Sequence, residues 1–334
     1  MRPANSAALL AAGALLIAGW WAFRSPGHGP SEPAENARAT AVPAPAAPAP
    51  QADPSRTPAG SPAGEDTNAR EIPTYFVTSE QDVIRVLEAH GLSQDAVARW
   101  AFAKGMDPAG FGITFGSQEA YTLYDDATLA ALADQGDAWA QQTLADRIWK
   151  ERPLEAADRY RDAASRGSAQ AARQLANLYF YAADALDRGR TGDWSEETIT
   201  ALRQAGEADG GLEVSALAWS LAGDAEAGLP EGSFASFMLS DYTQEDVDAA
   251  CRRAASIVAD NADQRARLGL EPGWSGPAPL FPDPAELNPP GCPEGLLPAP
   301  DLSACEAVRL EMDGMDPAAG DRSGFTLRVC PNGG

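Results

Sequence analysis

The sequence predicts an all-α fold, built as a short right-handed α/α solenoid of helix hairpins, over residues 71–268. The main observation is a passage that nearly repeats itself. Residues 136–145 and residues 167–176 share the order Gly, polar residue, Ala, any residue, Ala and then Leu-Ala. Copies of a helix-starting unit spaced by about thirty residues are typical of stacked helix hairpins. The second observation is the helical spacing of apolar residues around both copies.

Helix start and stop signals divide this region. Ser79 and Ser93 are placed as caps of two helices, and Gly91 suits the end of the first one. Similar signals predict further helices after Asp126, after Gly136, from Pro153, after Gly167, over about 196–208 and 212–227, and after Thr243. We expect the last of these helices to cap the solenoid.

The N-terminus carries a run of apolar and small residues over positions 7–23. About seventeen residues is the lower limit for a helix that spans a bilayer, and Trp20 and Trp21 fit an interfacial aromatic belt. A cleaved signal peptide is the alternative. It requires small residues just after the apolar run, where this chain has bulky ones. The sequence therefore favours an uncleaved transmembrane anchor over residues 1–24.

Residues 25–70 have the composition of a tether. They contain ten prolines, many alanines and no aromatic residue. Such a segment buries too little apolar surface to offset the entropy of ordering, so we expect an extended, disordered linker. The linker would hold the helical domain away from the membrane.

The chain is strongly acidic, with 48 acidic and 25 basic residues and a formal net charge of -23. A phosphate backbone would be repelled, so nucleic acid is not an expected partner. Solubility alone explains such a charge, while a basic partner or weak cation binding is the more specific interpretation.

The Pro- and Gly-rich tail, residues 269–334, contains three of the four cysteines, and the fourth lies in the preceding helix. The spacings do not match zinc or redox motifs, which favours disulfides in an oxidising compartment over reduced thiols. Residues 306–312 and 323–329 alternate like two strands. A hairpin of these strands would place Cys305 opposite Cys330, which leaves Cys251 to pair with Cys292. Two other connectivities remain open, as does a buried free thiol at Cys251.

Residues 129–180 resemble the Sel-one-like repeat, a relative of the tetratricopeptide repeat. The matching residues are 133–145, 156–167 and 175–179, with their Ala, Gly and Leu-Ala rhythm. The chain departs from the family where residues 149–153 replace the usual glycine-rich loop, and the array degenerates after Tyr181. The resemblance implies an adaptor that scaffolds protein complexes, and it supplies no catalytic residues.

These observations together predict a single-pass protein of the bacterial inner membrane, with its C-terminal domain in the periplasm. We expect it to be an adaptor that binds a protein or peptide of the cell envelope. The residues expected to line its binding surface are Trp139, Gln142, Arg173 and Asn177, although Trp139 suits the core equally well. A cell-wall enzyme that uses acidic residues and a non-specific spacer are the alternatives.

No catalytic, metal or cofactor site is predicted. His90 is the only histidine in the expected folded part, so a Ser-His-Asp arrangement has little support. Asp125 and Asp126 begin a helix, where acidic residues act as caps. Residues 313–321 contain three aspartates but lack the spacing and the closing Glu of a calcium loop.

Overall fold

The computed structural model describes residues 72–77, 80–106, 118–187, 189, 194–207, 210–233, 242–270, 276–287, 291–312 and 323–331. The predicted anchor and tether lie outside these residues and stay predictions, as does the calcium loop considered at 313–321. In the part that is described, no helix combines the length and the apolarity that crossing a membrane requires.

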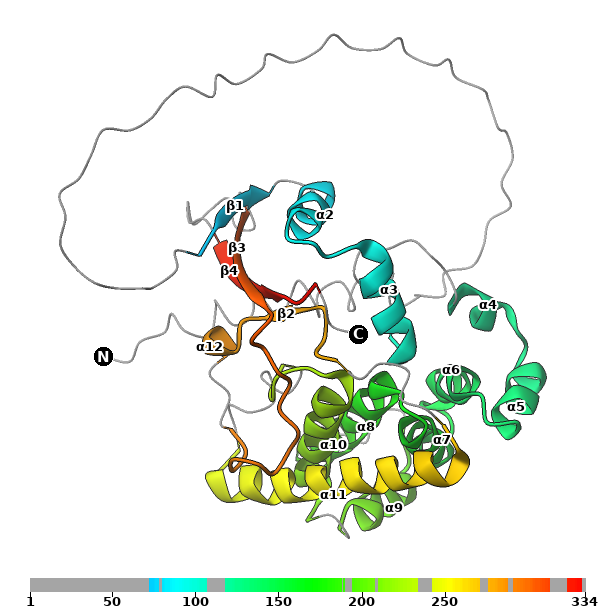
Figure 1. The fold of residues 1–334 in the computed structure, drawn as a ribbon. Coiled ribbons are helices and arrows are strands. Elements are labelled where there is room, and N and C mark those ends of the chain that lie inside the picture. Colours follow the sequence, from blue (N-terminus) through cyan, green and yellow to red (C-terminus); the bar gives the residue numbers. More distant parts are fainter. Residues whose placement is uncertain are drawn as a thin grey trace, which may run out of the picture. The chain divides into compact units, whose positions relative to one another are not determined.

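Helices make up most of the described chain (Figure 1). Those that precede the repeated passage are α2 (Glu80–Ala89), α3 (Gln94–Ala103) and α4 (Gln118–Leu123). The next are α5 (Asp126–Asp134), α6 (Ala138–Ile148), α7 (Pro153–Ser165) and α8 (Ala169–Asp187). The last are α9 (Glu196–Glu207), α10 (Leu212–Ala227), α11 (Gln244–Leu268) and the short α12 (Pro284–Leu287).

Helix boundaries follow the signals in the sequence. Asp125 and Asp137 are N-caps, and their carboxylates accept the backbone N–H of Thr128 at 2.7 Å and of Ala140 at 3.0 Å. A reciprocal capping box between Thr243 and Asp246 starts α11. These contacts satisfy N–H groups that the first turn of a helix leaves without partners.

Small residues allow the helices to pack closely. Consecutive helices contact each other from α5 to α8, and α10 packs against both α8 and α11. The alanines expected at these contacts, Ala140, Ala157, Ala164 and Ala171, are all buried. Gly223 of α10 lies so close to α8 that an added Cβ would be 3.2 Å from the Ala169 carbonyl oxygen.

The fold is not all-α, because the described chain also contains a four-stranded sheet. Its order is β1 (Thr74–Val77), β3 (Glu306–Met312), β4 (Ser323–Val329) and β2 (Leu280–Pro282). The β3–β4 hairpin confirms the predicted register, with Val308 opposite Leu327 and Leu310 opposite Phe325. The strand β1 pairs in parallel with β3. The strand β1 therefore joins the region before α2 to the tail, which the sequence analysis treated as a separate segment from residue 269 onward.

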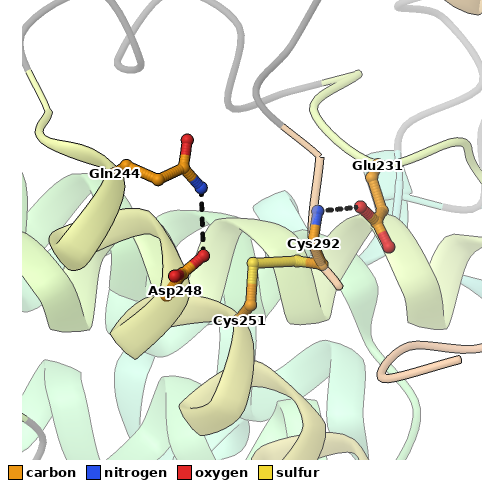
Figure 2. Close-up of a disulfide and its surroundings, with 5 residues drawn as sticks. All are labelled: Glu231, Gln244, Asp248, Cys251 and Cys292. Carbon is orange, nitrogen blue, oxygen red and sulfur yellow. Dashed lines mark hydrogen bonds between the residues drawn. A yellow bond between two sulfur atoms is a disulfide. The ribbon is translucent and has the colours of Figure 1, made fainter. Parts of the chain in front are cut away.

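The four cysteines form the two pairs preferred from the sequence. The Cα atoms of Cys251 and Cys292 are 5.5 Å apart, and those of Cys305 and Cys330 are 4.2 Å apart. Figure 2 shows the first pair, in which the Cys292 N–H donates a hydrogen bond of 2.8 Å to Glu231. This pair attaches the tail to α11 and the second closes the β3–β4 hairpin.

An acidic side chain between α6 and α7 makes stability depend on pH. Burial raises the pKa of Asp146 to about 7, although the Tyr160 hydroxyl donates it a hydrogen bond of 2.6 Å. The folded state thus holds a proton that the unfolded chain loses near pH 4. The contribution of Asp146 to stability therefore falls as pH rises from about 4 to about 7, and it is constant above that, where the carboxyl is ionised in both states.

We expect Asp146→Asn to raise the free energy of unfolding by about 2 kcal/mol at pH 8 and by almost nothing at pH 4. The amide still accepts the Tyr160 hydrogen bond but carries no charge. Urea unfolding at both pH values measures the effect. Asp134→Asn, which removes an exposed charge of α5, is the control for net charge. An equal gain from Asp146→Asn at both pH values would contradict the assignment.

Candidate protein-binding surface

The end of α3 lies against the start of α8 and the side of α6. The Gln170 N–H of α8 donates to the Lys104 carbonyl at 3.1 Å, and the Gln142 amide of α6 donates to the Gly105 carbonyl at 3.0 Å. The Ser168 hydroxyl in turn donates to Gln142 at 2.7 Å. The carbonyl groups at the C-terminal end of α3 thus face the N-terminal end of α8. This arrangement is favourable, because the two helix ends carry opposite partial charges.

Two of the predicted binding residues are buried: the exposure expected for Gln142 is wrong, while Trp139 takes the core position that the sequence left as its alternative. Gln142 is only 3% exposed and Trp139 only 8% exposed. The Phe102 ring of α3 stacks on Trp139 at 5.3 Å between centroids, and the Tyr121 ring of α4 stacks on it at 6.1 Å. Helices that precede the repeats therefore cover this face of α6.

The other two predicted residues, Arg173 and Asn177, lie half-buried on α8. Arg173 donates to Gln170 at 3.2 Å, and Asn177 donates to Gln174 at the same distance. Burial lowers the pKa of Arg173 to about 10, and the nearby Asp224 carboxylate opposes this shift. Arg173 therefore keeps its charge at neutral pH, inside the contact between α8 and α10.

A buried ionic cluster lies under the end of α3. Arg265 of α11 pairs with Glu226 of α10 at 3.0 Å. The pKa of the Lys104 amine is lowered, chiefly by burial and also by the nearby Arg265 charge. The Glu226 carboxylate opposes this shift only in part. The Trp100 ring nitrogen also donates to the Ala227 carbonyl at 2.8 Å. The end of α3 thus contacts α10 and lies near α11, while the part of the predicted face that Trp139 and Gln142 form is an intramolecular contact of α6.

An aromatic group with one exposed ring, Tyr181, lies elsewhere, on the turn after α6, the second half of α8 and the residues before α9. Trp149 stacks on Tyr181 with a centroid distance of 6.0 Å, and Trp194 meets the edge of Trp149 at 6.1 Å. The Lys150 ammonium lies 5.4 Å from the centre of the Trp149 ring. We call Trp149, Lys150, Tyr181 and Trp194 the aromatic platform.

Hydrogen bonding fixes the base of the platform while its outer ring stays open. The Trp194 ring nitrogen donates to the Lys150 carbonyl at 3.0 Å, and the Trp194 side chain is buried. Tyr181 is 53% exposed. Leu154 and Leu186, in the neighbouring turns of α7 and α8, are exposed as well. Exposed aromatic residues on a rigid base are typical of protein-binding sites.

A chain of three polar side chains connects β1, α2 and β3. The Tyr75 hydroxyl lies 3.0 Å from His90 Nε2, and His90 Nδ1 lies 3.0 Å from a Glu306 carboxylate oxygen. With Nδ1 protonated, His90 donates to Glu306 and accepts from Tyr75. The sequence indicated only a helix end at His90, because Glu306 lies 216 residues away in the chain and Tyr75 lies on β1, a strand that the sequence did not predict.

The described residues assemble no metal centre. None of their His, Cys, Asp and Glu side chains group in a way that would hold a metal ion. Asp125 is the predicted helix cap, and its hydrogen bonds from Thr128 lower its pKa. In the tail, Asp283 pairs with Arg328 at 2.9 Å.

Comparison with known proteins identifies no relative: no family model, curated protein or solved structure matches this chain. The resemblance to the Sel-one-like repeat therefore stays an expectation that rests on the residues of the repeated passage. Any function must be argued from the side chains and contacts of this chain.

Proposed function

We propose that this protein is a membrane-tethered adaptor of the bacterial periplasm, whose helical repeats bind another protein of the cell envelope. The apolar run at residues 7–23 would anchor the chain, and the Pro/Ala-rich linker would hold the folded part away from the bilayer. The two cysteine pairs suit an oxidising compartment.

In this proposal, α5 with α6 and α7 with α8 are two successive units of a right-handed α/α solenoid of the Sel-one-like kind. Each pair of helices is joined by a short turn, and neighbouring pairs bury alanines between them. Such units bury their apolar faces only by stacking, and they present extended surfaces to partners.

The observation that carries the proposal is the aromatic platform. Trp149 and Tyr181 come from two different helix pairs, and they stack with an interplanar angle of 20°. Tyr181 is more than half exposed although its partner Trp149 packs against the core, which supports a contact with another molecule at this place. Interfaces are enriched in Trp and Tyr, because these rings add contact area at a low entropic cost.

We expect Tyr181→Ala to abolish capture of the main partner while the folded domain keeps its thermal stability. The assay is crosslinking in intact cells, purification through a C-terminal tag and mass spectrometry. Tyr124→Ala is the matched control, because Tyr124 is also an exposed tyrosine but lies at the end of α4. A truncated chain with only anchor and linker sets the background.

Loss of one recurrent partner in Tyr181→Ala, but not in Tyr124→Ala, would support an adaptor that binds through the platform. Equal recovery in both variants would overturn the role of the platform. No partner above the anchor-and-linker background would count against an adaptor and favour the spacer.

A further inference from the structure

Within the described chain, the strand β2 is one edge of the sheet and pairs only with β4. The Pro279 carbonyl and the Asp283 N–H, which flank β2, each form a backbone hydrogen bond of 2.9 Å to β4 or to the residue after it. Backbone groups of successive strand residues point to opposite sides, so every second residue from 279 to 283 faces β4. The N–H and carbonyl of Leu280 and the carbonyl of Pro282 therefore point outward. No other residue that the structure describes is hydrogen-bonded to them.

A small apolar groove lies beside this edge, where β2 meets the helices α2 and α3. Leu280 lines the groove from β2, and Leu92 and Val97, both buried, line it from the start of α3. Ile84 and Leu87 of α2 are half-buried in its wall. The empty space in the groove and at its open mouth is about 310 Å³. Because this is the lower limit for small-molecule pockets, the groove suits a single side chain.

The lining of the groove carries no charge, although the chain has a formal net charge of -23. Its polar side chains are Ser93 and Gln94, and the Ser93 hydroxyl already accepts the Ala96 N–H at 3.2 Å as the cap of α3. A charged side chain would lose its hydration here and gain no opposite charge in exchange. The groove therefore favours an uncharged apolar side chain.

An extended segment bound along β2 would use the edge and the groove together. Its backbone would bond to the outward groups of Leu280 and Pro282, and the side chain opposite Leu280 would point to the same face of the sheet as the groove. The pairing would stay short, because β2 has three residues and Pro282 has no N–H. An edge of this kind accepts one segment without open-ended association.

We propose that β2 and this groove, here called the strand site, bind an extended segment of another protein. The backbone of that segment pairs with Leu280 and Pro282, and one of its apolar side chains fills the groove. The strand site is made by the sheet with α2 and α3, so this inference goes beyond the adaptor function proposed above and does not depend on the aromatic platform.

The test uses the full-length protein, purified in detergent without reductant, and a displayed library of random peptides of about nine residues. Ile84→Asp places a charge in the wall of the groove. We expect the parent protein to enrich uncharged peptides with an apolar residue among β-branched neighbours, and the Kd to be at least tenfold weaker for Ile84→Asp. Leu123→Asp changes an exposed leucine of α4 and should bind like the parent.

Backbone pairing is tested on the enriched peptides, which leaves the protein unchanged. Each peptide position is N-methylated in turn, which removes one N–H. We expect affinity to fall at least tenfold at two positions separated by one residue, since the Leu280 and Pro282 carbonyls accept from alternate N–H groups. The position between them should tolerate the methyl group. Hydrogen exchange of the Leu280 amide should slow when the peptide binds.

The other outcomes each count against the strand site. Equal enrichment on the parent protein and on Ile84→Asp would overturn it, as would peptides whose affinity no N-methylation changes. Peptides that bind Ile84→Asp but not Tyr181→Ala would place the binding on the aromatic platform, so the adaptor function would stand without this inference. A dimer of the parent protein that Ile84→Asp makes monomeric would mean that a second copy occupies the strand site.

Discussion

Replacing Cys251 and Cys292 together by alanine is expected to lower the free energy of unfolding by about 4 kcal/mol. The two cysteines are 41 residues apart in the sequence, so their disulfide removes much of the freedom of the unfolded chain. The midpoint of thermal unfolding should fall by roughly 8 to 15 °C for a domain of this size. Thermal melts of variant and parent protein, both without reductant, measure the change.

Within residues 71–334, the tail should become the first part of the variant to be cleaved by protease. The segment after Cys292 contributes Leu297 to the core of the helices, and the Cys292 N–H bonds to Glu231. Without the disulfide, these contacts alone hold the segment. A non-reducing peptide map of the parent protein should show Cys251 joined to Cys292. Free thiols at both positions, together with an unchanged melting temperature, would refute this prediction.

Local patterns in the sequence predicted the features that depend on local contacts. The alternation of residues 306–312 and 323–329 was sufficient to identify both strands and the side chains that face the core, because a one-residue slip would turn Val308 and Leu310 away from it. Capping residues similarly located the starts of α5, α6 and α11. In each case the deciding residues lie within a few positions of the element they define.

Pairings between distant segments could not be predicted in this way. The strand β1 has four residues, and its partner β3 begins more than two hundred residues later. A strand this short has too few residues for alternation to distinguish it from a loop. The all-α prediction was therefore confirmed only in part: the described chain is mostly helical, and the sequence anticipated β3 and β4 but neither β1 nor β2.

The binding residues show the same limit. Trp139 and Gln142 both lie in the first half of α6; a solvent-facing position suits the polar Gln142, and the sequence left Trp139 open between surface and core. Their burial depends on Phe102 and Gly105, which come from a different helix and carry no local sign of their target. The aromatic platform is likewise assembled from Trp149, Tyr181 and Trp194, whose proximity depends on how the helices stack.

Gly105→Ala is expected to lower the free energy of unfolding by about 3 kcal/mol, because it separates α3 from α6 and α8. Gly105 has a φ of +71°, which costs any other residue energy. An added Cβ would lie 2.8 Å from a Gln142 side-chain oxygen and even closer to the Ser168 hydroxyl. Chemical denaturation measures the loss, and the fluorescence of Trp100 and Trp139 should report the altered contact.

Gly269→Ala separates backbone strain from steric conflict. Gly269 has a similar φ of +66°, but an added Cβ there would meet nothing within 4 Å. Gly269→Ala should lower the free energy of unfolding by only about 1 kcal/mol. The difference between the losses in the two glycine variants therefore measures the steric conflict at the end of α3. Ser168→Ala removes the atom that lies nearest to the added Cβ. The double variant Gly105→Ala, Ser168→Ala should therefore lose about 1 kcal/mol less unfolding free energy than the sum of the two single variants. Equal losses in both glycine variants, without this coupling, would mean that the end of α3 does not lie against α8.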